Sequence, residues 1–220
     1  MANERIGLFG GTFDPIHFGH LRVAEELAIH LKLDRVLFIP AAQQPHKPRH
    51  GPVDFKHRLA MLELAINERA GFETSDIEAG LPLPSYTVNT VRALKQKEAG
   101  ELIFLVGYDS FSHIKSWRGY KELMDMTAMA VFQRPGTVGD RRSLLSLLGE
   151  AIGTPPEWEP SVGAFVWPDR PCIYYYEGCR LHISSTDLRQ RLAAGDSVRY
   201  LLPEAVRDYL NKRGLYSPNN

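Results

Sequence analysis

The chain has 220 residues, 44% of them hydrophobic, which predicts one domain spanning residues 1–220 with a substantial core. Lys and Arg together number 26, and so do Asp and Glu, giving a formal net charge of zero. Because there is no basic excess to follow a phosphate backbone, we expect no nucleic-acid partner, although a small anionic ligand needs only a local positive site.

The sequence shows no apolar run long enough for a signal peptide or a membrane span, so we expect a cytoplasmic protein with no membrane partner. The two cysteines, Cys172 and Cys179, are too few and wrongly spaced for a zinc site or a CxxC redox pair, and we expect free thiols. Whether the chain forms a homo-oligomer stays open.

Short aliphatic runs alternate with amphipathic segments along the chain, as in βαβ units around a parallel sheet. Strands are expected at residues 5–9, 35–39, 102–106 and 128–132. A helix capped by Asp54 would bury one stripe of apolar residues, namely Phe55, Leu59, Leu62 and Ile66. Another helix would begin at Ser85 and end before Gly100. The predicted fold class is α/β, a Rossmann-like, doubly wound parallel sheet with helices on both faces.

Two proline-rich segments interrupt this alternation. Residues 43–52 (QQPHKPRHGP) follow the second strand and predict an exposed, stiff loop. Residues 153–171 carry interleaved aromatic side chains, and the pattern leaves open whether they form a lid or a packed surface loop.

The loop after the first strand, GGTFDPIHFGH, gathers the features of an anion site. Gly10 and Gly11 let a phosphate approach the backbone closely, and Asp14-Pro15 predicts a turn in which the Asp side chain bonds to following amides. A helix beginning near Gly19 would offer free N–H groups, with His17 and His20 at its mouth. The alternative is that the histidines merely cap the helix or pack. Neither GxGxxG nor a P-loop is present, which disfavours a dehydrogenase and a P-loop kinase.

This loop resembles the [T/H]xGH signature of the nucleotidyltransferase superfamily, and the bacterial nicotinate-nucleotide adenylyltransferase family is the closest resemblance, over most of the chain. The resemblance implies a nucleotidyltransferase-type fold. It also implies four catalytic residues, His17, His20, Lys47 in IPAAQQPHK and Arg189. Lys47 and Arg189 would meet the leaving pyrophosphate.

Further motifs resemble the family's pyridine-nucleotide side. The segment SYTVNTVRAL places Ser85, Tyr86 and Thr87 at this side, and Trp117 resembles the aromatic residue that stacks on the pyridine ring. Ser85 and Thr87 are also good cap residues in any protein, and a tryptophan is more often part of a core. The family commonly has an acidic residue where this chain has Asn89, which leaves a substrate contact from Asn89 open.

The ATP side is implied by four motifs: the first loop, the strand-and-turn LIFLVGYDS, the turn RPG and the last motif, ISSTDLR. The residues implied are Gly10, Gly11, Thr12, Phe13, Gly107, Asp109 and Arg134, together with Ile183, Ser184, Ser185 and Thr186 of the last motif. For Asp109 the alternative is helix capping, and for Arg134 it is an ordinary turn.

The last motif, ISSTDLR, lies where the pattern predicts a strand giving way to a helix. Ser184 and Asp187 match a capping box, and Arg189 would lie about one turn inside the helix. We expect residues 184–220 to form a C-terminal helical part that ends in a packed helix from Val198.

The resemblance implies transfer of AMP from ATP to nicotinate mononucleotide, with Mg²⁺ held mainly by the substrate phosphates rather than by protein ligands. Nicotinamide mononucleotide or phosphopantetheine as acceptor, or a non-catalytic nucleotide-binding regulator, are the alternatives. Spacing does not decide between acid and amide.

Overall fold

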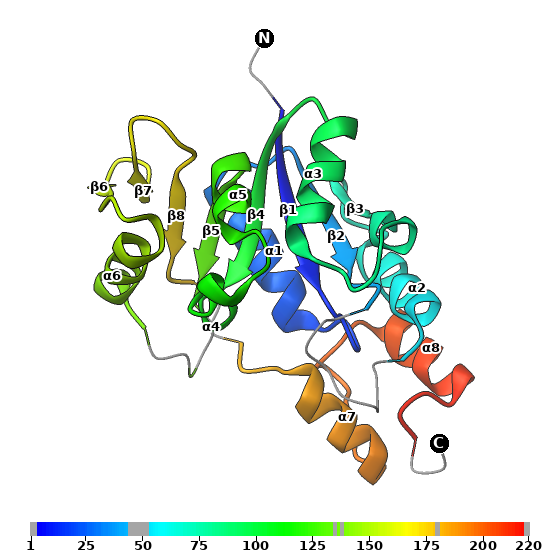
Figure 1. Cartoon of the computed structure of the whole chain (residues 1–220). Coiled ribbons are helices and arrows are strands. Elements are labelled where there is room, and N and C mark those ends of the chain that lie inside the picture. The colour runs from blue at the N-terminus through cyan, green and yellow to red at the C-terminus, as the bar shows by residue number, and fades with distance from the viewer. Residues whose placement is uncertain (1–3, 44–52, 134–135, 137–138, 179–180, 218–220) are drawn as a thin grey trace.

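A computed structural model describes residues 4–43, 53–133, 136, 139–178 and 181–217. Its centre is an eight-stranded sheet in the order β3-β2-β1-β4-β5-β8-β7-β6 (Figure 1). The strands are β1 (Arg5–Gly11), β2 (Arg35–Pro40), β3 (Phe72–Thr74), β4 (Glu101–Gly107), β5 (Ala128–Phe132), β6 (Glu157–Glu159), β7 (Ala164–Val166) and β8 (Ile173–Tyr176). The pairs from β3 to β8 are parallel, and β7 and β6 pair antiparallel at one edge.

Strand order reverses beside β1. The chain proceeds from β1 to β2 and β3 on one side, and then crosses to β4 and β5 on the other. The register pairs Gly11 with Pro40 and Phe9 with Leu105, so the carboxyl ends of β1, β2 and β4 meet at one edge. In open parallel sheets this switch point is where ligands bind, which places Gly10 and Gly11 at the expected site.

Helices cover both faces of the sheet, which confirms the predicted fold class (Figure 1). Along β4, Phe104 belongs to one apolar cluster and Leu105 to the other, as the two-residue period of a strand requires. Helices α3 (Thr87–Lys97), α5 (Tyr120–Met126) and α6 (Arg141–Ile152) pack on the first cluster. Helices α1 (Phe18–His30), α2 (Phe55–Ile66) and α8 (Glu204–Arg213) pack on the second. The remaining helices are α4 (Tyr108–Phe111), α7 (Ser185–Ala194) and the short 3₁₀ turns η1 (Ile77–Gly80) and η2 (Ile114–Ser116).

The four predicted strands are confirmed, but two helix starts were wrong. Helix α3 begins at Thr87, because Ser85 stays outside it and its hydroxyl accepts from the Gln43 amide at 3.2 Å. It ends at Lys97, before Gly100. The last helix begins at Glu204 instead of Val198, because Pro203 fits the position before a helix and lacks an N–H for its interior.

The predicted apolar stripe of α2 was also partly wrong. Leu62 and Ile66 are buried, but Phe55 and Leu59 are only half-buried, and Arg58 is 1% exposed on the inner face. Asp54 is the residue before the helix, yet its side chain makes no capping hydrogen bond. Arg58 occupies the interior because its guanidinium donates there to the backbone carbonyls of Val53 and Thr12.

Residues 153–171 are more regular than a surface loop. They contain β6 and β7, which extend the sheet, and Trp158 and Phe165 pack with ring centroids 5.0 Å apart. Strands of three residues are too short to show a period, which explains why the pattern did not predict them.

Two smaller expectations concern thiols and membranes. Cys172 is a free, half-buried thiol, as expected, while Cys179 lies outside the described residues. Burial raises the pKa of the Cys172 thiol. In the parts of the chain that the structure describes, no helix has the length and apolar character needed to cross a membrane.

Candidate active site

Two cavities meet at the carboxyl end of β1. The smaller has a volume of about 400 Å³ and lies between the loop after β1 and the start of α7. The larger, about 880 Å³, lies beside β4 and the start of α3. Phe9, Gly10, Gly11 and Ser110 line both cavities. A molecule in one cavity therefore comes close to a molecule in the other at Gly10 and Gly11.

His17 and His20 lie at the mouth of α1, as predicted. His17 is the capping residue: its Nδ1 accepts from the His20 amide at 3.4 Å. Because Nδ1 accepts, the proton of a neutral His17 ring lies on Nε2, on the opposite side of the ring. The two rings stack with centroids 3.7 Å apart and 27° between their planes. Capping is thus one role of His17, but both rings also line the smaller cavity.

Tight packing holds these rings in place. A Cβ on Gly19 would lie 3.0 Å from the His17 ring and 3.3 Å from the Ile183 carbonyl, so a larger residue would push both segments apart. Phe13 adopts φ 51°, a left-handed conformation that costs a non-glycine residue about 1–2 kcal/mol. Its ring meets the His20 ring edge-on, with centroids 5.1 Å apart. The strained backbone of Phe13 therefore lies directly beside the histidine rings.

The start of α7 forms the opposite wall of the smaller cavity. Ser184 caps this helix, its Oγ accepting from the Asp187 amide at 3.1 Å, which confirms the predicted cap. Ser185 donates from its hydroxyl to the Pro15 carbonyl at 3.0 Å, which ties α7 to the loop after β1. Arg189 Nη2 donates to Thr186 Oγ1 at 3.2 Å. A helix N-terminus and a guanidinium thus face the two histidines across one cavity.

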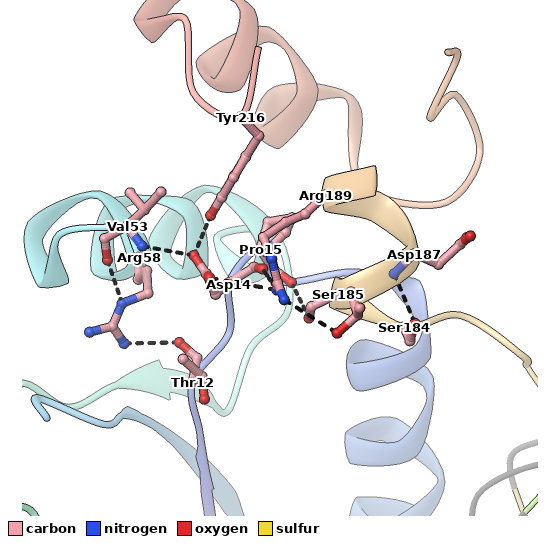
Figure 2. A network of polar contacts seen from close by, with 11 residues as sticks. Thr12, Asp14, Pro15, Val53, Arg58, Ser184, Ser185, Asp187, Arg189 and Tyr216 are labelled. Carbon is pink, nitrogen blue, oxygen red and sulfur yellow. Dashed lines mark hydrogen bonds and ion pairs between the residues drawn. The ribbon is translucent and has the colours of Figure 1, made fainter. Parts of the chain in front are cut away.

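Asp14, which lines this cavity, and Arg58 organise a polar network (Figure 2). The Arg58 guanidinium donates to the Val53 carbonyl at 2.8 Å and to the Thr12 carbonyl at 2.9 Å. Burial lowers the pKa of Arg58, although the charge of Asp14 opposes that shift. The Asp14 carboxylate accepts from the Val53 amide at 3.1 Å, and Arg189 donates to the Asp14 carbonyl at 2.7 Å.

The partners of Asp14 differ from the prediction. Its side chain was expected to bond to amides just after it in the turn, but its bonds go to residues far along the chain, Val53 and Tyr216. Asp14 is 4% exposed, because segments distant in the sequence pack over its side chain and supply its hydrogen-bond donors.

The larger cavity is more apolar in its side chains and carries flat aromatic rings. Trp117 is half-buried, packs edge-on against Phe104 with centroids 6.2 Å apart, and lines the cavity together with Tyr86 and Thr87. The Arg118 guanidinium lies 4.9 Å from the centre of the Tyr86 ring. The described lining of the cavity therefore offers aromatic faces and the Arg118 cation to a ligand.

Glu78 is a buried carboxylate of the larger cavity. It is 8% exposed, and its two oxygens accept from the Ala42 amide at 3.1 Å and from the Thr90 hydroxyl at 2.8 Å. Through these two bonds Glu78 links the segment after β2 to α3, and so holds together two parts of the cavity wall.

The structure brings together most of the residues singled out in the sequence. Those on the smaller cavity are Gly10, Gly11, Thr12, Phe13, His17, His20, Ile183, Ser184, Ser185, Thr186 and Arg189. Those on the larger cavity are Ser85, Tyr86, Thr87, Gly107 and Trp117. Asp109, in the first turn of α4, and Asn89, whose Oδ1 accepts from Arg92 at 2.9 Å, line neither cavity. Lys47 and Arg134 lie outside the described residues.

Sequence reasoning missed Glu78, Arg58 and Arg118. A lone acid before a proline-rich turn and an arginine in a helical stripe carry no signal of burial, since such residues are usually exposed. Arg118 directly follows Trp117, where the pattern shows only an arginine that is ordinarily a solvated charge.

Comparison with known proteins agrees with this geometry. Residues 8–191 match a family model described as cytidylyltransferase-like, which places the chain in that class of nucleotidyltransferases. The chain is 41% identical over 214 residues to "Probable nicotinate-nucleotide adenylyltransferase" of Geobacter sulfurreducens, covering 97% of this chain and 98% of the relative. It is 39% identical over 217 residues to the Roseiflexus castenholzii protein of the same name, covering 98% and 100%. The chain belongs to the nicotinate-nucleotide adenylyltransferase family, which confirms the resemblance.

A solved structure supports the fold. The structure titled "Plasmodium falciparum nicotinic acid mononucleotide adenylyltransferase complexed with NaAD" superimposes with a TM-score of 0.74 at 20% identity, covering 97% of each chain. The same sheet and helices therefore extend over almost the whole of both chains.

Proposed function

We propose that this protein transfers AMP from ATP to nicotinate mononucleotide, forming nicotinate adenine dinucleotide and pyrophosphate in NAD biosynthesis. The relatives at about 40% identity carry the name of this activity. The observation that carries the proposal is the meeting of two unlike cavities at Gly10 and Gly11. One suits phosphates and the other suits a flat ring, which is what a reaction between two nucleotides requires.

The reaction joins an oxygen of the mononucleotide 5′-phosphate to the α-phosphorus of ATP. It breaks the bond between that phosphorus and the oxygen that bridges the α- and β-phosphorus atoms. The electron pair of the broken bond leaves with pyrophosphate. A phosphate monoester is largely deprotonated at neutral pH, so the attacking group needs no general base. Both reactants are anions, and the protein's tasks are to align them and to neutralise developing charge.

The residues of the smaller cavity suit these tasks. His17 and His20 would donate to the α- and β-phosphates, with the N-terminus of α7 and Arg189 on the other side of the triphosphate. Because these donors are held by stacking, capping and close packing, they need little reorganisation as charge develops. From the family motifs alone, Lys47 is proposed as a further contact to the pyrophosphate and Arg134 as a further contact to ATP.

We infer Mg²⁺ as the accompanying ion, held mainly by substrate phosphates. When bound, it would neutralise charge on the triphosphate and on the departing pyrophosphate. Asp14 is the one carboxylate among the described residues that line the smaller cavity, and it already accepts from Val53 and Tyr216. This donor set fits an ion that keeps phosphate and water ligands, as Mg²⁺ does in many nucleotide enzymes.

On the acceptor side, Trp117 would stack on the pyridine ring, with Ser85, Tyr86 and Thr87 around it. Arg118 supplies a positive charge at this cavity, which favours the acid over the amide as the ring substituent.

The test is pyrophosphate release by the purified protein with Mg²⁺ and ATP, with nicotinate mononucleotide, nicotinamide mononucleotide or phosphopantetheine offered in parallel. The proposal predicts fast release with the nicotinate compound and much slower release with the other two. Release with phosphopantetheine alone would assign a different acceptor. ATP binding without release for any acceptor would point to a regulator that keeps the fold.

A further inference from the structure

The C-terminal segment reaches back to the loop after β1 through one side chain. The Tyr216 hydroxyl donates to Asp14 Oδ1 at 2.5 Å, across 202 positions of sequence (Figure 2). Burial, reinforced by the hydrogen bond to Asp14, raises the pKa of the Tyr216 hydroxyl, so this group remains a proton donor at physiological pH.

Backbone conformation after α8 aims Tyr216 in this direction. Gly214 ends the helix with φ 63°, and the Leu215 amide donates back to the Leu210 carbonyl at 3.1 Å. A glycine in this left-handed conformation is the common way to end a helix and reverse the chain. Tyr216 itself has φ 61°, a left-handed conformation that is unfavourable for a residue with a Cβ. The strained residue is therefore the one whose side chain bonds to Asp14.

Asp14 joins four segments of the protein. Its Oδ1 accepts from both Tyr216 and the Val53 amide, and its Oδ2 lies 3.6 Å from Arg189 Nη1. That same Nη1 donates to the Asp14 carbonyl at 2.7 Å. The side chain of Asp14 is 6% exposed, so its charge depends on these few donors.

Arg189 is therefore shared between two anions. The Asp14 carboxylate attracts its guanidinium, and a triphosphate bound in the smaller cavity would attract the same guanidinium. Each neutral donor on Asp14 satisfies part of the carboxylate and weakens its hold on Arg189. Loss of the Tyr216 hydroxyl would leave the carboxylate more dependent on Arg189 and would draw the guanidinium away from the cavity.

We propose that Tyr216 is a positioning residue for the phosphate site, whose hydroxyl holds the Asp14 carboxylate and so limits its competition with the triphosphate of ATP for Arg189. The inference rests on the proposed function in taking ATP as the anion in the smaller cavity. Tyr216 acts through Asp14 and Arg189 and does not itself line that cavity.

The test compares Tyr216→Phe with Tyr209→Phe. Tyr209 is a matched control because it is also a half-buried tyrosine of the C-terminal region, and its hydroxyl is bonded to His57 Nδ1 at 2.8 Å, outside the Asp14 network. Both substitutions remove one bonded hydroxyl. Thermal unfolding measures the cost to the fold, and calorimetric titration with Mg²⁺ and a non-hydrolysable ATP analogue measures the phosphate site without any acceptor.

The inference predicts that Tyr216→Phe weakens binding of the ATP analogue by about tenfold, the scale of a hydrogen bond to a charged group. The KM for the acceptor should stay within about twofold, and Tyr209→Phe should change neither value. In an Asp14→Asn background, Tyr216→Phe should add little, because the charge that it controls is gone.

Three results would overturn the inference: unchanged analogue binding in Tyr216→Phe, equal weakening of analogue and acceptor, or the same weakening in Tyr209→Phe. The proposed function fails separately, if the unmodified protein binds the ATP analogue but forms no dinucleotide. If the unmodified protein binds no ATP analogue, both fail.

Discussion

Replacing His20 with alanine tests the imidazole as a phosphate donor without removing the hydrogen bond that caps α1. The bond that caps α1 runs from the backbone amide of His20 to His17 Nδ1, so it survives loss of the imidazole. His20 is only half-buried and lies against an open cavity, so its truncation leaves no sealed void in the core. The substitution therefore removes one phosphate donor and leaves the helix start intact.

The magnitude follows from the role that His20 would play. A preorganised donor to charge that develops in the transition state is worth about 10²–10³ in kcat, or about 2.7–4 kcal/mol. His17 remains 3.7 Å away in the native stack, so some neutralisation survives in the variant. We expect kcat to fall by about 10²-fold and the KM for ATP to change by less than about fivefold.

Steady-state pyrophosphate release at saturating Mg²⁺, with ATP and nicotinate mononucleotide varied in turn, measures both constants. His57→Ala is the matched control, because it also removes a half-buried imidazole, one that is hydrogen-bonded to Tyr209 at 2.8 Å and lies outside both cavities. A folded His20→Ala protein whose kcat stays within about threefold of the unmodified value would refute the donor role, since a hydrogen bond to a charged group is worth more, about 1.5–3 kcal/mol.

Three other substitutions test separate parts of the structure. Trp117→Ala should raise the KM for nicotinate mononucleotide roughly tenfold, the scale of one stacked ring, and leave the KM for ATP within about twofold; equal changes in both would exclude stacking. Arg58→Met should cost about 3 kcal/mol and lower Tm by roughly 6–12 °C, because it removes a buried guanidinium that donates to the half-buried Val53 and Thr12 carbonyls; an unchanged Tm in calorimetry would contradict this. Burial raises the pKa of Tyr174 to about 12, above an unfolded value of about 10, so its contribution to stability is complete below about pH 10 and is lost toward pH 12. The urea midpoint of the unmodified protein should therefore fall relative to that of Tyr174→Phe over this range, and parallel pH profiles would be inconsistent with a buried phenol.

Local signals in the sequence predicted the parts of the site that local sequence builds. The loop after β1 and the start of α7 each lie within a dozen residues, and glycine, capping serine and histidine have strong positional preferences there. The four buried strands were predicted for the same reason, because continuous aliphatic runs are typical of parallel strands covered on both faces.

Features that depend on contacts distant in sequence were not predictable. Asp14 meets Tyr216 across the length of the chain, and no spacing rule connects two such residues. Arg58 interrupts an apolar stripe because, in the folded state, its guanidinium donates hydrogen bonds to the backbone carbonyls of Val53 and Thr12. The edge strands β6 and β7 are held by pairing and by aromatic packing rather than by any periodicity of their own.

The most direct test of the account is to follow ATP labelled at the α-phosphorus through a reaction with Mg²⁺ and nicotinate mononucleotide. Direct attack at that phosphorus predicts that all of the transferred label appears in the dinucleotide, with one unlabelled pyrophosphate released for each dinucleotide formed. Label that accumulates in ADP, in free AMP or on the protein would contradict adenylyl transfer between two nucleotides held side by side at Gly10 and Gly11.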